Sequence, residues 1–167
     1  MKYNFLNLGG KNNIYRFETN SKIIYEIKFK PTPYLFGDDK NELSEYIFEF
    51  IIEVAFNPNL KLSPNDLLIG ATIAKILKDF YILKDNTASI YICDSSDGKQ
   101  LSRERKFNQW FDYFNDSNFI KFNESLFDNN QNLFPIAIIM KKDNPYALKI
   151  IGAFLDIVNH NNDNKNI

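Results

Sequence analysis

The order in which strand-like and helix-like apolar patterns follow one another constrains the fold of this chain more than any other feature. Three early segments alternate apolar and polar residues with the period of two that half-buried strands show: Ile14–Glu18, Ile23–Lys30 and Tyr46–Phe56. In the third, one side carries only apolar residues: Tyr46, Phe48, Phe50, Ile52, Val54 and Phe56. The patterns predict an antiparallel meander with one core face and one partly wet face.

The remaining patterns complete the order of elements. Strands are expected over Ala88–Cys93, Phe119–Phe127 and Leu133–Met140, and helices over Ser63–Leu83, from Asp97 through the aromatic residues near Phe114, and over Asn144–Val158. The order β-β-β-α-β-α-β-β-α predicts an α+β fold with a mixed sheet. We expect one domain over residues 1–158, followed by a flexible, Asn-rich tail over residues 159–167.

Local signals place the ends and faces of the helices. Ser63 followed by Pro64 is typical of an N-cap and a first helical position, and Asp97 is a second candidate N-cap. Gly70 lowers helix propensity by about 1 kcal/mol relative to alanine, so we expect it to pack closely against a strand. The second helix carries aromatic residues at the spacing of a core stripe: Phe107, Trp110, Phe111 and Phe114.

Composition excludes several classes of function. The chain has 20 basic and 21 acidic residues, which makes nucleic acid an unlikely partner, and no apolar run long enough to cross a membrane. A cytoplasmic location is the expectation. A single cysteine, Cys93, and a single histidine, His160, predict neither a disulfide framework nor a metal site. We expect Cys93 to be a buried thiol rather than a nucleophile.

The end of the fourth strand and the first part of the second helix hold the candidate binding residues: Asp94, Ser95, Ser96, Arg103 and Arg105. Arg103 precedes Phe107 by four positions, which places it on the core stripe, where a guanidinium needs a partner. In one interpretation Arg103 and Asp94 form a clamp that fixes the turn. In the other, Arg103, the two serines and the helix N-terminus bind an anion, with Arg105 on the solvated edge beside it. We favour the clamp, because a paired state is the commoner fate of a buried charge.

A second constellation lies on the predicted hairpin. Glu26-Ile27-Lys28, with Glu18 across the turn, is similar to the Glu-x-Lys motif of metal-dependent nucleases, in which carboxylates bind Mg²⁺. Half-exposed strands produce the same pattern whenever opposite charges pair across them. We favour that structural interpretation and expect no metal.

Two resemblances follow from these residues. The stretch from Tyr91 to Gln100, with Arg103–Phe107 and Trp110-Phe111, resembles a family of small bacterial proteins of unknown function, and the likeness reaches back to Tyr25–Phe29. This resemblance implies no activity.

The order of elements is also similar to that of GNAT-type acyltransferases. That resemblance implies an acyl-CoA, such as acetyl-CoA, in a splay between the third predicted strand and Ala88–Cys93, and a tyrosine general acid near Tyr113. The family's glycine-rich phosphate loop is absent, because the corresponding stretch, Asn59–Asp66, contains no glycine.

Three functions remain as expectations, and catalysis is left open among them. The first is a degenerate acyltransferase-like domain that binds a small anionic ligand or a protein partner without catalysis. The second is an active GNAT-type N-acyltransferase, and the third is a protein-interaction module of a mobile-element or defence system. The sequence leaves the partner and a homo-oligomeric state open.

Overall fold

The computed structural model describes residues 1–32, 42–59, 66–94 and 96–163. Its seven strands are β1 (Phe5–Gly9), β2 (Ile14–Glu18), β3 (Ile24–Pro31), β4 (Ile47–Phe56), β5 (Ala88–Ile92), β6 (Phe119–Phe127) and β7 (Leu133–Lys141). Its helices are α1 (Leu67–Leu83), α2 (Gln100–Phe114) and α3 (Ala147–Asp163), with a 3₁₀ turn, η2, over Glu42–Glu45.

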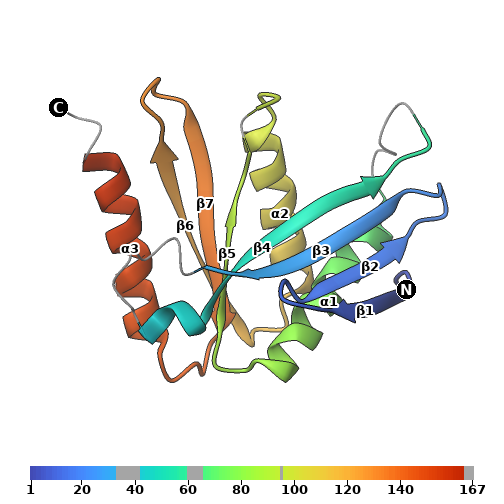
Figure 1. Cartoon of the computed structure of the whole chain (residues 1–167), viewed down its shortest axis with the longest axis horizontal. Helices are drawn as coiled ribbons and strands as arrows, with labels where there is room; N and C mark the ends of the chain where they lie inside the picture. The colour runs from blue at the N-terminus through green and yellow to red at the C-terminus, as the bar shows by residue number, and fades with distance from the viewer. Residues whose placement is uncertain (33–41, 60–65, 95, 164–167) are drawn as a thin grey trace.

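All seven strands belong to one mixed sheet, in the order β1-β2-β3-β4-β5-β7-β6. Every neighbouring pair is antiparallel except β4 and β5, which run parallel because α1 connects them. This confirms the α+β class and the mixed sheet. The predicted meander is present as β2-β3-β4, and β1 extends it by one strand at the edge (Figure 1).

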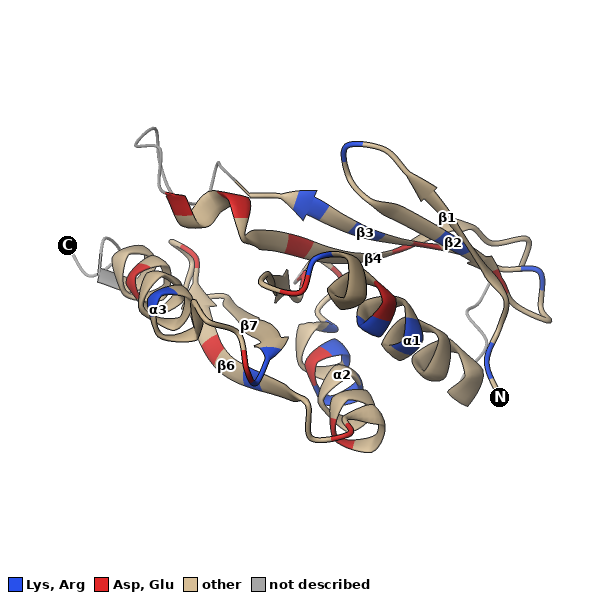
Figure 2. Cartoon of the chain, turned by 90° about the horizontal axis from the view of Figure 1, so that it is seen from below, with Lys and Arg blue, Asp and Glu red and all other residues tan. Residues whose placement is uncertain are grey.

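Helices cover both faces of the sheet (Figures 1 and 2). The apolar run Ile136–Met140 in β7 is not interrupted by polar residues, because both of its sides are buried. Ala137 and Ile139 pack in the core with α1, whereas Ile136 and Met140 pack in a second core with α3. A strand buried on both faces has no polar side to present.

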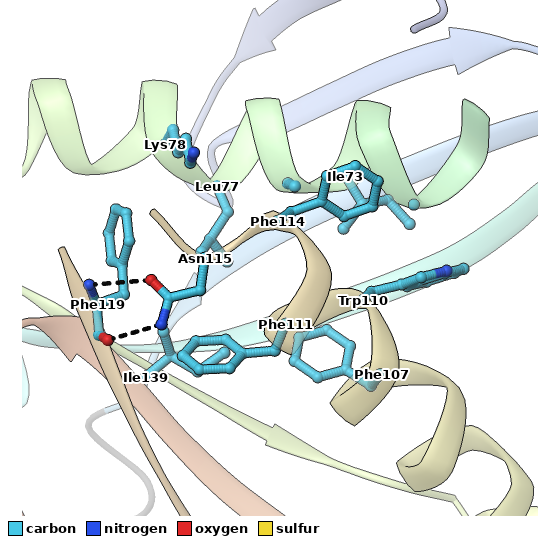
Figure 3. A pocket seen from close by; sticks show the side chains of 12 residues that line it. Ile73, Leu77, Lys78, Phe107, Trp110, Phe111, Phe114, Asn115, Phe119 and Ile139 are labelled. Carbon is cyan, nitrogen blue, oxygen red and sulfur yellow. Dashed lines mark hydrogen bonds between the residues drawn. The ribbon is translucent and has the colours of Figure 1, made fainter. Parts of the chain in front are cut away.

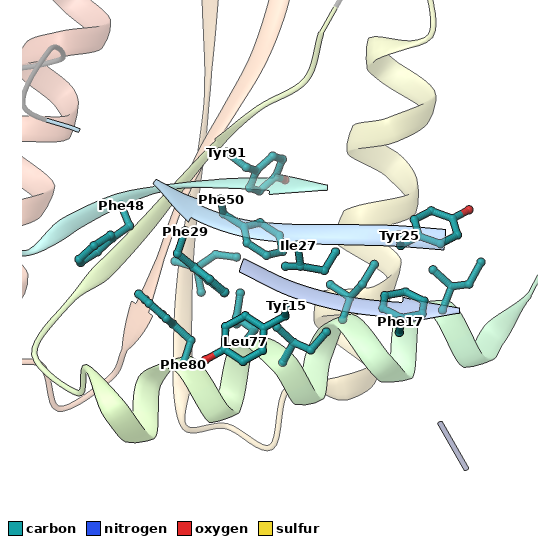
Figure 4. Packing of buried hydrophobic residues seen from close by; sticks show 14 of the residues in the cluster. Tyr15, Phe17, Tyr25, Ile27, Phe29, Phe48, Phe50, Leu77, Phe80 and Tyr91 are labelled. Atoms are coloured by element: carbon teal, nitrogen blue, oxygen red, sulfur yellow. The ribbon is translucent and has the colours of Figure 1, made fainter. Parts of the chain in front are cut away.

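Aromatic rings dominate the core beneath α1. The rings of Phe80 and Phe29 lie 3.7 Å apart and nearly parallel, with an interplanar angle of 3°. Phe48 and Tyr81 meet the Phe80 ring edge-on, at centroid distances of 5.3 Å and 5.8 Å. This cluster ties α1 to β3 and β4 (Figure 4).

Several predicted boundaries were wrong. Strand β1 was not predicted, because two asparagines and a Gly-Gly pair weaken its pattern. Helix α1 begins after Asp66, whose carboxylate caps it, and the predicted cap at Ser63 and Pro64 lies outside the described residues. Helix α2 begins at Gln100 rather than after Asp97.

The predicted flexible tail is helical over its first part, since α3 continues to Asp163. The side chain of Asn162 holds this end against β6: its Oδ1 accepts from the Phe127 N–H at 3.2 Å and its Nδ2 donates to the Ser125 carbonyl at 3.0 Å. Residues 164–167 of that tail lie outside the described residues. Sequence patterns do not register such long-range polar contacts.

Gly70 does pack closely, but against a helix rather than a strand. A Cβ at this position would lie 2.6 Å from Nε1 of Trp110 on α2. Only glycine allows the indole ring to lie this close to the backbone of α1.

Candidate functional site

The most open feature of the sheet is the place where β4 and β5 part. The two strands pair over three positions only, from Ile47 opposite Ala88 to Glu49 opposite Ile90, whereas β4 continues to Phe56. Figure 1 shows the two strands diverging beyond this point. The stretch Phe50–Phe56, called here the open edge, therefore has a strand neighbour on its β3 side alone within the described part of the chain.

Apolar side chains are exposed along the outer part of the open edge. Ile52 lies opposite Ile27 and Val54 opposite Tyr25, both buried, so Ile52 and Val54 point to the side of the sheet that α1 covers. Their exposed fractions are nevertheless 37% and 38%. The core face predicted for β4 is therefore not buried beyond Phe50, where the described residues supply no further strand beside it.

An aromatic cluster closes the inner end of this divergence. Phe107 of α2 contacts both Phe50 of β4, at 5.8 Å between ring centroids, and Tyr91 of β5, at 4.2 Å. The Tyr91 hydroxyl is buried and has no hydrogen-bond partner among the described residues. Burial raises the pKa of Tyr91, so this hydroxyl remains a protonated donor at neutral pH.

Arg103 is held by an internal clamp, as we favoured, but with a different carboxylate. Its Nη1 and Nη2 donate to the two carboxylate oxygens of Asp97, each at 2.7 Å, and Nη1 also donates to the backbone carbonyl of Asp94 at 2.8 Å. This bidentate arrangement satisfies the guanidinium and ties the start of α2 to the end of β5. Arg103 is not on the buried face, since 44% of its side chain is exposed.

Of the other predicted binding residues, Asp94, Ser96 and Arg105 are described by the structure. The Asp94 carboxylate accepts from the backbone N–H of Ser96 at 3.0 Å and from its hydroxyl at 2.5 Å. Arg105 is exposed, and Ser95 lies outside the described residues. Arg103 and Ser96 therefore both have partners within the chain, and the grouping of Arg103 with both serines around an anion stays a prediction.

The clamp predicts a pH-dependent stability. The hydrogen bonds from Arg103 lower the pKa of Asp97 to about 2, below the ordinary value for aspartate of about 3.9. A carboxyl with a depressed pKa stabilises the folded state above about pH 4, and this contribution is lost as the pH falls toward 2. Urea unfolding between pH 5 and 2 should therefore show a shallower loss of stability in Asp97→Asn than in the wild type. Arg103→Gln should remove the same part of the slope, and equal slopes in all three proteins would contradict the clamp.

The N-terminus of α1 is also occupied by the chain's own carboxylate. Asp66 Oδ1 accepts from the N–H of Leu68 at 3.0 Å, and its Oδ2 accepts from the hydroxyl of Tyr3 at 2.6 Å. A helix N-terminus attracts anions, but here the cap already supplies the negative charge.

Three candidate reactive groups lie in unsuitable places. Tyr113 is 82% exposed, and its ring contacts Phe114 of the same helix. Cys93 is buried, and this burial raises the pKa of its thiol to about 11, so it stays protonated at neutral pH. His160 belongs to α3, on the face of the sheet opposite α1 and α2.

The acidic and basic residues of β3 form an ion-pair ladder on its outer surface. Arg16 of β2 pairs with Glu26 at 2.5 Å and Glu53 of β4 pairs with Lys28, while Glu26 and Lys28 pair within β3 at 3.2 Å. Glu18 pairs instead with Lys22 in the turn, at 2.8 Å. Over residues 1–32, 42–59, 66–94 and 96–163, no three side chains of His, Cys, Asp or Glu gather where they could share a metal ion. The ladder matches the structural interpretation of Glu26 and Lys28.

The distribution of charge and hydropathy favours no particular class of partner. Figure 2 shows basic and acidic residues interspersed on α1 and α2 rather than gathered by sign. Among the described helices, none has both the length and the hydropathy that crossing a bilayer requires.

Comparison with known proteins places the chain in a family. The model of a family of unknown function (DUF6169) matches residues 65–156, which is more than half of the 167 residues and runs from just before α1 into α3. A comparison with curated proteins gave no match. The resemblance to a family of unknown function is thereby confirmed, whereas neither comparison supports the GNAT resemblance.

Proposed function

The chain belongs to the DUF6169 family of unknown function, and we propose that it is a binding domain without catalytic activity. Its ligand is an extended segment of a partner protein, which binds along the open edge of β4. The observation that carries the proposal is the length of that edge. Strand β4 continues for seven residues, Phe50–Phe56, beyond its last pair with β5.

An extended peptide is the ligand that complements such an edge. Backbone N–H and C=O groups alternate along it, and another strand offers matching groups at the same spacing. Peptide recognition by strand addition gains affinity from these hydrogen bonds and specificity from alternate side chains. Ile52 and Val54, both exposed, would contact apolar side chains at every second position of the partner segment.

The surroundings of the open edge favour binding over catalysis. Asp66 caps α1, and Asp97 is paired with Arg103 beside the start of α2, so both helix starts carry a carboxylate of the chain itself. Asp66 would repel a phosphate-bearing ligand, and the Arg103 guanidinium that could attract one is already paired with Asp97. The nearest thiol, Cys93, has a raised pKa, and Tyr113 is directed to solvent.

A second candidate is an acyltransferase-like domain that binds acetyl-CoA in the same place. It is favoured by the strand order β1-β2-β3-β4-β5-β7-β6, in which the parallel pair β4 and β5 diverges as the GNAT resemblance implies. The two amide groups in the CoA arm, rather than a peptide, would then form hydrogen bonds with the backbone of the open edge. Asp66 and the lack of a glycine-rich loop weigh against the pyrophosphate.

Panning of a displayed library of 12-residue peptides against the purified protein tests the proposal. We expect enrichment of segments with apolar residues at alternate positions, and binding of a selected fluorescent peptide that Ile52→Lys weakens at least tenfold. A lysine on an edge strand opposes strand addition because its charge would be buried on pairing. The matched control is Leu6→Lys on the outer edge strand β1, where 66% of the side chain is exposed; it should leave the affinity unchanged.

Thermal-shift measurements with acetyl-CoA and CoA separate the two candidates. Stabilisation by either compound, strengthened by Asp66→Asn, would favour the acyltransferase-like alternative. If no peptide is enriched, or if Leu6→Lys and Ile52→Lys reduce binding equally, the proposed role of the open edge is wrong.

A further inference from the structure

We propose that a cavity between α1 and α2 binds the end of an uncharged aliphatic chain. The cavity has a volume of about 40 Å³ and lies beneath the second half of α2 (Figure 3). Phe107, which contacts Phe50 at the inner end of the open edge, also lines it. Its walls come from α1, α2 and the adjoining ends of β6 and β7, and include Ile73, Leu77, Trp110, Phe111, Phe114 and Phe119. The inference is independent of the function proposed above.

The lining is mostly apolar and has few charged or amide groups. Lys78 and Asn115 are its only side chains of that kind, and both are engaged elsewhere. The Lys78 ammonium donates to Asp116 at 3.0 Å, while the Asn115 amide bonds the backbone N–H and C=O of Phe119 at 3.3 Å and 3.0 Å. A polar or charged ligand group would therefore lose its hydration without replacement, whereas methylene groups lose nothing.

The size of the cavity selects a chain end over a ring. A water-sized group needs about 10–15 Å³ measured in this way, so 40 Å³ accommodates about three such groups in a row. Benzene occupies engineered cavities of about 150 Å³, which is far larger. Two or three carbons of a straight chain fit the space.

The packing of α2 allows this space to be entered. None of its residues is buried, although four aromatic side chains point toward the core, and all four line the cavity: Phe107, Trp110, Phe111 and Phe114. Access therefore requires no fully buried side chain of α2 to move.

Trp110 makes occupancy directly measurable. It is the only tryptophan of the chain, and it lines the cavity against Gly70, so its emission reports on this one place. We would titrate the full-length protein with straight-chain 1-alkanols from ethanol to hexanol. Each buried methylene is worth about 0.8 kcal/mol, or about fourfold in the dissociation constant. We expect a saturable change in Trp110 emission. The fourfold gain in affinity per added methylene should stop once about three carbons of the alcohol occupy the cavity.

Two variants that change the cavity in opposite directions complete the test. Ala74→Leu on α1 fills the cavity and should abolish the saturable change, whereas the same substitution at Ala153 on α3 should leave it intact. Phe114→Ala enlarges the cavity and should extend the fourfold increments to longer chains. A response that rises linearly with alcohol in every variant, or that Ala74→Leu leaves unchanged, overturns the proposal.

Discussion

Replacing Phe80 by alanine is expected to lower the free energy of unfolding by about 3–5 kcal/mol. The side chain is 1% exposed and meets three other aromatic rings: it stacks on Phe29 and contacts Phe48 and Tyr81 edge-on. The substitution removes the apolar contact area and leaves a cavity that the neighbouring rings cannot fill, because β3 and β4 fix their backbones. Urea unfolding followed by circular dichroism measures the loss.

The matched control for this substitution is Leu83→Ala on the same helix. Leu83 is the last residue of α1 and 68% exposed, so its truncation should change the free energy of unfolding by less than about 0.5 kcal/mol. If Phe80→Ala cost no more than Leu83→Ala, the aromatic cluster would not be the centre of the fold's stability.

The same substitution at two buried tyrosines should have opposite results. The Tyr81 hydroxyl lies 2.9 Å from Ser89 Oγ and donates to the carbonyl of Ile139 at 2.7 Å, and both partners are buried. Tyr81→Phe leaves these groups without their partner, which costs about 1–3 kcal/mol. The measurement is again the free energy of unfolding.

Tyr91→Phe supplies the comparison, because its hydroxyl is buried without a partner among the described residues. Removing an unsatisfied hydroxyl ends a desolvation cost, so Tyr91→Phe should leave the stability unchanged or raise it by about 1 kcal/mol. A loss as large as that of Tyr81→Phe would mean that the Tyr91 hydroxyl is satisfied in solution.

A stabilising Tyr91→Phe would also bear on function. A protein retains a buried, unsatisfied group at a cost, and such positions cluster at functional sites. Tyr91 contacts Phe107, which also touches Phe50 at the start of the open edge. If the selected peptide bound more weakly to Tyr91→Phe despite its unchanged stability, the hydroxyl would be part of the binding site.

Local patterns in the sequence determined the class of the fold, the order of elements after β1 and most of their faces. The alternation of apolar and polar residues along Ile24–Pro31 indicates a strand buried on one face, and the continuous apolar run of β7 indicates one buried on both. Each strand's own residues are enough to predict this. The sequence also predicted that Arg103 forms an ion pair, because a guanidinium close to carboxylates in the chain is expected to bind one of them. The exact carboxylate, Asp97 rather than Asp94, depended on where α2 begins.

The tertiary structure alone decided the features on which the candidate sites rest. The apolar pattern of β4 continues to Phe56, yet its outer half is exposed, because β5 diverges after three pairs. Likewise, Gly70 and Trp110 meet only because α1 and α2 cross there, and the cavity beside them follows from that crossing. A residue's own pattern records whether it can be buried, whereas the presence of a neighbour to bury it depends on segments far away in the chain.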